Sequence, residues 1–389
     1  MAGKARTLYR MAIIQPAIAA SLLVGCQDRG ADQAYGYRQL LAGAEEEGSL
    51  TIYSTTDRHE AAGLIAAFKR RYPHIAIDYR DMPSRSIYNI VIAQANAHQK
   101  GADLVWSSAM DLQTKLVNDG YAQSYASPQK RHLPAWAIWK DQAWGTTAEP
   151  VVIAYNRNLL PASDVPHSRA ELTHLLVSKR ESLRGRIATL DPRTSSTGYL
   201  FISQDVQISR DTGPLIVSMG RADVKLYPLT TEILDPLADG RVLLAYNIIG
   251  SYALERQQQD PSIGVVMPTD HTLVMTRIAL ILQNAAHPNA AKLFLDFMLS
   301  KDGQSELARQ YMTPVRDDVA AAPNARAPTS IARALRISPA LIANVDVLKR
   351  RRFLNRWYAL LTGDAPAADR TTSGAKGKDS AGQANQQKD

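Results

Sequence analysis

The chain contains a single cysteine, Cys26, among its 389 residues. One thiol cannot close an intramolecular disulfide, and it cannot supply the clustered thiolates of a structural zinc or iron–sulfur site. The motifs H-E-x-x-H and G-x-S-x-G and the phosphate-binding P-loop are also absent. These absences predict a chain without a resident metal or cofactor, and they argue against an enzyme.

An excess of charge of one sign is missing as well, since 45 Lys and Arg residues face 37 Asp and Glu residues. The net charge of +8 is small for this length, and three of the basic residues lie within the first ten positions. We therefore expect no nucleic-acid partner. Apolar residues make up 45% and charged residues 21%, which is typical of globular proteins and excludes a wholly disordered or collagen-like chain. The length allows roughly two domains.

The N-terminus has the layout of a secretory signal, with a basic start followed by an apolar run from Met11 to Gly25. This run is short for a transmembrane helix, and Gln15 and Pro16 interrupt it. We expect residues 1–25 to be a signal peptide that is removed on export.

Leu23-Val24-Gly25-Cys26 resembles the bacterial lipobox, in which the cysteine receives lipid chains and becomes the new N-terminus. We therefore expect Cys26 to be lipidated, residues 26–47 to form a polar tether that ends in an acidic helix near residues 45–47, and the protein to lie in the periplasm, anchored by its lipid to a bacterial membrane. The alternative is an ordinary secretory signal followed by a free, buried cysteine.

Short apolar segments rich in β-branched residues alternate with segments whose apolar residues recur every three or four positions. The first kind predicts buried strands, and the second predicts amphipathic helices. Their alternation predicts βαβ units and a mostly parallel sheet. The predicted strands lie at 50–54, 75–79, 102–106, 186–190 and 241–246. The predicted helices lie near 64–72, 86–98, 168–178, after 197, 288–299 and 338–361.

Two longer apolar segments, residues 149–156 and 273–282, stand out from this pattern. Two α/β lobes joined by two such strands would form a hinged clamshell whose cleft lies at the carboxyl ends of parallel strands, where ligands bind. This arrangement favours a binding protein. The expected parts are lobe 1 (48–148 plus 273–316), lobe 2 (149–272), C-terminal helices (317–361) and a disordered tail (362–389) without Val, Ile, Leu, Met or aromatic residues.

Five segments carry a resemblance to a known family. They are GSLTIYSTTDRHEAAGLIAAFKRRYP (48–73), GADLVWSS (101–108), WGTTAEPVVIAYN (144–156), LLAYNIIGSYALERQ (243–257) and PTDHTLVMTRIALILQNAAHPNAAKLFLDFMLSKDGQ (268–304). With them the chain resembles the extracellular solute-binding proteins of ABC importers. The resemblance is to the branch that holds ferric-ion binders, sugar-phosphate binders and the phosphoglycerate transport regulatory protein.

The resemblance implies a type 2 periplasmic-binding-protein clamshell of class α/β, each lobe a mostly parallel sheet flanked by helices. It implies a monomer that captures a small solute and presents it to an ABC permease. Residues 349–357 (KRRRFLNRW) look more like the regulatory members, so a membrane sensor kinase is the alternative partner.

The resemblance also allows a comparison with the iron ligands of the ferric binders. Those proteins use paired tyrosines after the strand that here ends at Tyr246, but this chain has Ile248 and Ile249 near the expected positions, and Ser108 where they have a carboxylate. Ferric iron requires such hard oxygen ligands. We therefore expect another ligand, although Tyr246 and Tyr252 keep the ferric receptor as an alternative.

Hydroxyl-rich turns follow several predicted strands or precede helices, and these turns are our candidate ligand site. Backbone N–H groups and hydroxyls at helix starts suit a small anion, such as a phosphate ester or carboxylate, whereas each turn alone could be an ordinary helix cap. The candidates are Ser54, Thr55, Thr56, Ser107, Ser108, Thr194, Ser195, Ser196, Thr197, Gly198, Asn247, Ser251 and Tyr252.

Arginines could neutralise such an anion. The candidates are Arg58, Arg193 and Arg277, of which Arg277 lies on the second long strand and would either clamp a phosphate or pair with a carboxylate such as Asp270. Tyr155, at the end of the first long strand, is a further candidate for the cleft. Four tryptophans could line an aromatic wall or pack in the core, namely Trp106, Trp136, Trp139 and Trp144.

Two remaining patterns point elsewhere but weakly. Ser127-Pro128-Gln129-Lys130 matches the S-x-x-K of penicillin-interacting serine enzymes, yet its companion motifs are missing, so an envelope hydrolase is only a distant alternative. The basic run 349–352 could contact anionic lipid, although apolar residues interleaved with it favour a helix with one solvated face.

Overall fold

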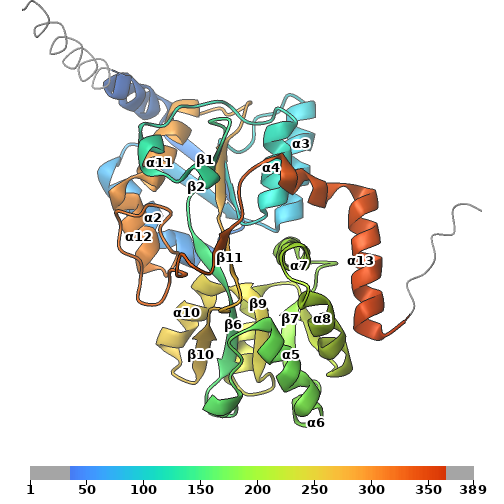
Figure 1. The fold of residues 1–389 in the computed structure, drawn as a ribbon. Coiled ribbons are helices and arrows are strands. Elements are labelled where there is room, and N and C mark those ends of the chain that lie inside the picture. Colours follow the sequence, from blue (N-terminus) through green and yellow to red (C-terminus); the bar gives the residue numbers. More distant parts are fainter. Residues whose placement is uncertain (1–35, 365–389) are drawn as a thin grey trace, which may run out of the picture.

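The computed structural model describes residues 36–364, which form two α/β lobes with a helical strap along one side (Figure 1). Residues 1–35, with the predicted signal peptide and Cys26, and most of the predicted disordered tail lie outside the described residues. Within residues 36–364, no helix is long and apolar enough to cross a bilayer.

The first lobe is built on a six-stranded sheet in the order β2-β1-β3-β12-β5-β4. Strands β1, β2 and β3 are parallel, and β12 pairs antiparallel with β3. The strands are β1 (Ser49–Ser54), β2 (Ala76–Asp81), β3 (Leu104–Ser107), β4 (Ile138–Trp139), β5 (Ala143–Gly145) and β12 (Ile278–Ile281). The helices of this lobe are α2 (Arg58–Arg71), α3 (Ser84–Asn96), α4 (Met110–Asn118), α11 (Pro288–Leu299) and α12 (Lys301–Arg309).

The second lobe is built on a seven-stranded sheet in the order β13-β11-β6-β9-β7-β8, with β10 also paired to β6. The strands are β6 (Glu149–Asn156), β7 (Ile187–Leu190), β8 (Lys225–Tyr227), β9 (Leu244–Ile249), β10 (Ile263–Val266), β11 (Thr272–Met275) and β13 (Ala332–Ala334). The helices are α5 (Arg169–Ser178), α6 (Arg180–Leu183), α7 (Ser196–Ile208), α8 (Thr212–Arg221), α9 (Thr230–Ala238) and α10 (Gly250–Gln259). Two α/β lobes confirm the predicted fold class.

The chain passes between the lobes within one of the two apolar segments singled out in the sequence and just before the other, because β6 (149–156) lies wholly in the sheet of lobe 2. The predicted strand 273–282 is in fact two strands, because β11 belongs to the sheet of lobe 2 and β12 to the sheet of lobe 1. The other passage lies between β5 and β6. The expected lobe 1 segment 273–316 therefore begins too early, since residues up to Met275 pair with β6 and β13.

The predicted tether 26–47 differs from the structure in its second half. Residues 36–47 are helical, and Leu40, Leu41 and Ala44 pack against the core of lobe 1. Glu47 accepts the backbone N–H of Ala290 at 2.8 Å and so caps the start of α11. This segment is part of the folded domain.

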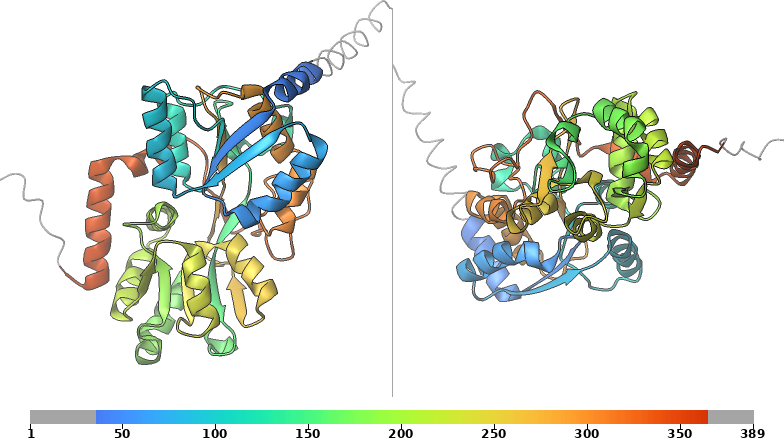
Figure 2. Two further views of the ribbon diagram at one scale, coloured as in Figure 1. Left: turned by 180° about the vertical axis from the view of Figure 1, so that it is seen from behind. Right: turned by 90° about the horizontal axis from the view of Figure 1, so that it is seen from below.

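The C-terminal residues form a strap that contacts both lobes and runs along them in the left view of Figure 2. A 3₁₀ helix, η4 (Pro339–Val345), packs against α4 of lobe 1, and α13 (Val347–Thr362) packs against α8 of lobe 2. Asp346 separates the two by accepting the backbone N–H of Lys349 at 2.8 Å, which caps α13. Trp357 anchors α13 in the core of lobe 2.

Arg277 lies between β11 and β12, and its buried guanidinium connects the lobes. It donates to Glu149 Oε1 at 2.9 Å and to Oε2 at 3.1 Å. On the lobe 1 side it donates to Thr56 Oγ1 at 2.8 Å and to Glu60 Oε2 at 3.1 Å. On the lobe 2 side it reaches the Ser251 hydroxyl at 3.3 Å.

The two carboxyl groups around Arg277 differ in charge state. Burial alone would raise the pKa of Glu149, but its bidentate bond to Arg277 outweighs burial and lowers the pKa below the ordinary value. Burial raises the pKa of Glu60 to about 7, although Arg277 opposes this, and Glu60 Oε1 has no hydrogen-bond partner among the described residues. Arg277 thus neutralises the carboxylate of Glu149, whereas the carboxyl of Glu60 holds a proton at pH values below about 7.

We predict that Arg277→Leu lowers the free energy of unfolding by about 3–5 kcal/mol, because it leaves the Glu149 carboxylate buried without its counter-charge. Urea denaturation of the purified protein measures the change. The control Arg71→Leu removes an exposed ion pair with Asp302 and should cost about 0–1 kcal/mol. A loss no larger than that of the control would show that Arg277 does not hold the passage together.

The raised pKa of Glu60 predicts a dependence of stability on pH. The folded protein binds the proton of Glu60 more tightly than the unfolded chain, so the associated stabilisation is complete below about pH 4.5 and is lost as pH rises to about 7. Wild type should therefore lose stability relative to Glu60→Gln across this window. Denaturation curves at several pH values test this, with exposed Glu46→Gln as the control, and parallel curves for wild type and Glu60→Gln would refute it.

Candidate functional site

A cavity of about 380 Å³ lies between the lobes, and both lobes contribute its walls. Lobe 1 supplies loops that follow β1, β2 and β3, and lobe 2 supplies the starts of α7 and α9. Loops at the carboxyl ends of parallel strands meet at one edge of each sheet, which is why these distant segments converge. The predicted residues that line the cavity are Thr55, Ser108, Thr194, Ser195, Ser196, Thr197 and Tyr252.

The lobe 1 hydroxyls hold one another in place. Thr55 Oγ1 accepts the backbone N–H of Ser108 at 3.0 Å and donates to Ser107 Oγ at 3.2 Å. Ser54 Oγ donates to the carbonyl of Trp106 and accepts the backbone N–H of Thr56. These bonds fix the loop after β1 and leave the Ser54 hydroxyl committed within it. Of the predicted lobe 1 hydroxyls, only Thr55 and Ser108 line the cavity.

In lobe 2 the turn before α7 combines capping with exposure to the cavity. Ser195 Oγ accepts the N–H of Gly198 at 3.1 Å, so Ser195 caps α7, while Thr194, Ser196 and Thr197 stand beside it on the cavity wall. A Cβ at Gly198 would lie 2.7 Å from the Leu190 Cβ, so glycine here allows α7 to pack against the end of β7. Gly198 therefore supports the wall and is not part of it.

Several predicted ligand residues lie elsewhere. Arg277 and Ser251 belong to the buried connection between the lobes, and Asp270, the other suggested partner of Arg277, pairs with Arg169 at 3.1 Å. Asn247 is buried and donates to Asp205 at 2.5 Å.

Two further candidates also miss the cavity. Arg58 donates to the backbone carbonyl of Tyr79 and is stacked over the Tyr79 ring at 5.6 Å. Tyr155 lies on β6 opposite Gly264, where the β6–β10 pair continues away from the cavity. Of the two alternatives for the tryptophans, core packing is confirmed for Trp106 and Trp144, which are fully buried in the core of lobe 1 and do not line the cavity.

Sequence reasoning missed the acidic residues of the cavity. Asp57 follows β1, Asp81 ends β2, and Glu232 lies in the first turn of α9, and all three line the cavity. Burial and the neighbouring Asp57 raise the pKa of Asp81. Asp57 and Asp81 lie at the ends of predicted strands, and this position in the sequence could have identified them as cavity residues. Among residues 36–364, no lysine or arginine lines the cavity.

Side-chain contacts among the described residues join the lobes across the cleft. Ser84 Oγ lies 3.0 Å from Ser196 Oγ, and the Tyr252 hydroxyl donates to Asp57 at 2.7 Å. At the rim, His59 Nε2 lies 3.1 Å from the Glu255 carboxylate. The cavity therefore lies between lobes that touch.

The geometry bears on the two alternative functions. Tyr246 is fully buried and donates to Asp205 at 2.6 Å, so it cannot form a tyrosine pair with Tyr252 in the cavity. Among residues 36–364, no three His, Cys, Asp or Glu residues are placed to hold a metal ion. Ser127 donates to Asp296 at 2.6 Å, whereas Lys130 pairs with Asp141, so the S-x-x-K residues do not form a nucleophile and base.

Residues 63–332 match the model of a family described as bacterial extracellular solute-binding protein. The chain belongs to this family. The match confirms the resemblance noted in the sequence, and it assigns the protein to the extracytoplasmic binding proteins that deliver small solutes to ABC transporters.

Solved structures agree with this membership. The substrate-binding protein of an ABC transporter from Agrobacterium tumefaciens is 38% identical, with a TM-score of 0.76, over 80% of this chain and 94% of that chain. Two structures at 19% identity share the fold. They are iron-bound HitA from Pseudomonas aeruginosa (TM-score 0.63; 78% and 98% covered) and AfuA from Actinobacillus pleuropneumoniae with fructose-6-phosphate (TM-score 0.65; 81% and 98% covered). No curated protein matches the chain.

We predict that Ser84→Cys combined with Ser196→Cys forms a disulfide between the lobes, because the two hydroxyl oxygens are 3.0 Å apart. Cys26→Ser in the same chain removes the competing thiol. Thiol titration after mild oxidation should show both cysteines consumed in a monomer, whereas Ser84→Cys alone should keep its thiol. Free thiols in the oxidised double variant would contradict the observed contact between the lobes.

Proposed function

We propose that the cleft captures a small polyhydroxylated anion, such as a phosphate ester or a hydroxycarboxylate, for delivery to an ABC permease. The observation that carries the proposal is the convergence of hydroxyls, helix starts and carboxylates from both lobes on one cavity of about 380 Å³. This volume is within the usual range for small-molecule sites.

The N-termini of two helices at the cavity would bind the negatively charged group of the solute. α7 begins at Ser196 and α4 begins at Met110, directly after the cavity residues Ser108 and Ala109. The first N–H groups of a helix lack partners within the helix, and the helix dipole favours negative charge there. The hydroxyls of Thr194, Ser196 and Thr197 add donors beside the start of α7.

The carboxylates of the cavity would accept hydrogen bonds from the hydroxyls of the solute. Asp57, Asp81 and Glu232 are acceptors, so they would bind sugar-like hydroxyls and would repel a bare inorganic anion. This combination favours an ester or hydroxy acid over phosphate or sulfate. The fructose-6-phosphate in the AfuA structure, a member of the same fold, has this chemistry.

We also propose that Cys26 carries the lipid anchor and that the protein acts as a monomer at the periplasmic face of a bacterial membrane. The LVGC sequence at 23–26 supports this. A sensor kinase is the alternative reader of the solute-bound form.

We predict that 3-phosphoglycerate or glycerol 3-phosphate raises the melting temperature of the protein by a few degrees. At a concentration 100 times Kd, binding stabilises the folded state by about 2.7 kcal/mol. Loss of one neutral hydrogen bond in Thr231→Val or Ser196→Ala should weaken binding about two- to tenfold in calorimetric titrations. Ser305→Ala, on α12 away from the cavity, is the control.

Two results would contradict this proposal. If citrate and both phosphate esters leave the melting temperature unchanged, the solute class is wrong, although the family assignment stands. If Ser305→Ala weakens binding as much as the two cavity variants do, the solute does not bind in the cleft.

A further inference from the structure

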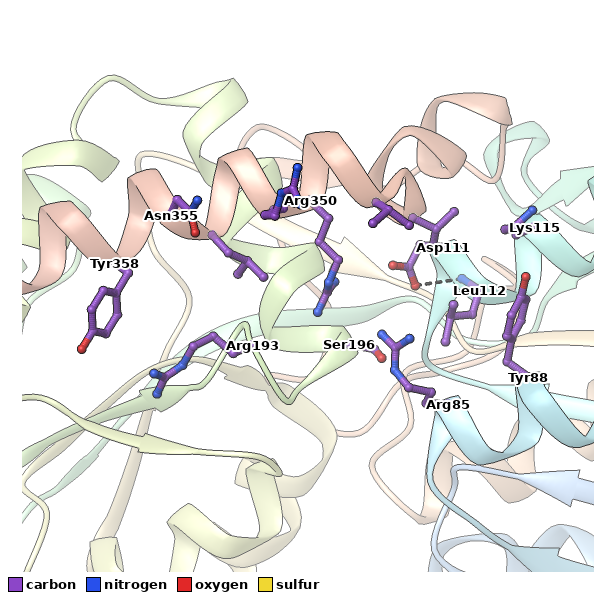
Figure 3. Close-up of a pocket in the computed structure, with 14 residues that line it drawn as sticks. Arg85, Tyr88, Asp111, Leu112, Lys115, Arg193, Ser196, Arg350, Asn355 and Tyr358 are labelled. Atoms are coloured by element: carbon purple, nitrogen blue, oxygen red, sulfur yellow. Dashed lines mark hydrogen bonds between the residues drawn. The ribbon is translucent and has the colours of Figure 1, made fainter. Parts of the chain in front are cut away.

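The C-terminal strap encloses a second cavity, of about 720 Å³, between α13 and both lobes (Figure 3). Lobe 1 contributes residues of α3 and α4, lobe 2 contributes Arg193 and Ser196, and the strap contributes residues from Val345 to Tyr358. Helix α13 begins beyond residue 332, where the family match ends. One wall of the cavity is therefore built by a part of the chain that the family match does not include.

The lining of this cavity carries more positive charge than the neighbouring carboxylates neutralise. Arg85 and Arg351 make no hydrogen bond or ion pair with any residue of the described part of the chain. Arg350 donates to the carbonyl of Pro192 at 3.0 Å and stacks over the Tyr199 ring at 4.1 Å, but it has no carboxylate partner within hydrogen-bond distance.

The other charged groups of the lining do not offset these three arginines. Lys115 and Arg193 are already paired, with Asp119 and Asp191 respectively. Asp111 is the single acid in the lining, and burial raises the pKa of its carboxyl to about 6, although Arg350 and Arg85 oppose this. At neutral pH the cavity remains net positive.

The side chains are aimed at one place. Figure 3 shows Arg350 reaching from α13 and Arg85 reaching from α3 toward the start of α7 at Ser196. Tyr88 and Leu112 lie farther along the same cavity and offer an apolar surface. An anionic group between the two guanidinium groups and an apolar part against Tyr88 and Leu112 would use both features.

The two cavities share Ser196 but are distinct. The contact between Ser84 and Ser196 stands where they meet. Among the described residues, the lining of the cleft contains acids and no lysine or arginine, whereas the lining of the cavity under α13 contains five lysines and arginines and one acid. The two linings thus differ in charge.

We propose that the cavity between α13 and the two lobes is a second binding site, for a soluble organic phosphate held by Arg85 and Arg350. This proposal goes beyond solute capture in the cleft, because its site depends on the strap. The solute of the cleft can be misassigned without affecting it.

Calorimetric titration of the full chain with phenyl phosphate and with inorganic phosphate tests the proposal. Phenyl phosphate should bind more tightly than inorganic phosphate, because its ring gains the apolar wall. Arg85→Gln should weaken phenyl phosphate binding about tenfold or more. Because Arg85 is exposed, this variant should fold normally, and Arg350→Gln should have the same effect on binding.

Matched controls make the result decisive. Arg210→Gln removes an exposed arginine that does not line this cavity and has no ion pair within residues 36–364, so it should leave Kd unchanged, as should the cleft variant Thr231→Val. No binding of either phosphate would overturn the proposal. Equal weakening by Arg210→Gln would reduce the effect to general charge, and weakening by Thr231→Val alone would move the phosphate to the cleft. Binding to vesicles of anionic phospholipid without binding to free phenyl phosphate would assign the arginines to a membrane surface.

Discussion

The buried guanidinium of Arg277 is the interaction on which the two-lobed arrangement depends. It lies where the chain passes from one sheet to the other, and it bonds to Glu60 of lobe 1, to Ser251 of lobe 2 and to Glu149 at the start of β6. A buried arginine needs this many acceptors to offset its lost hydration. The same bonds fix the ends of β6, α2 and α10 relative to one another, and so they position the loops that line the cleft.

The cleft and the cavity under α13 are built from different elements of this two-lobed arrangement. In the cleft, loops at the ends of strands present hydroxyls and carboxylates, and the lobes touch through Ser84, Ser196, Asp57 and Tyr252. Along the strap, η4 packs on lobe 1 and α13 packs on lobe 2, so α13 adds a helix that contributes arginines from outside the two sheets. A movement of the lobes would change both cavities, because each draws residues from both lobes.

Much of the fold follows from the sequence, because strands and helices alternate with clear periodicity and the segments at or next to the passages between the lobes are apolar. The family also follows, from the segments between residues 48 and 304. About half of the predicted site residues line the cleft, since the rule that ligand residues follow strand ends is independent of side-chain detail. The same rule would have found Asp57 and Asp81, but a search for anion donors passed over acids.

The remaining errors have a common cause, which is that the sequence does not show long-range partners. Arg277 suggested a phosphate clamp, but Glu149 lies 128 residues away and Glu60 lies 217 residues away, and both reach it only in the folded chain. Asn247 was likewise expected at the ligand site, but its side chain donates a hydrogen bond to Asp205, which is distant in the sequence. Residues 36–47 were expected to be a tether because they are polar overall, yet Leu40, Leu41 and Ala44 give them one apolar face that packs on lobe 1.

The central claim is that one solute contacts both lobes inside the cleft. Hydrogen–deuterium exchange with and without 3-phosphoglycerate tests it most directly, because exchange reports on backbone groups loop by loop. If one solute bridges the lobes, exchange slows at residues 55–57 and 108–110 of lobe 1 together with residues 194–198 and 230–232 of lobe 2. Slowing confined to one lobe, or located away from these loops, would contradict it.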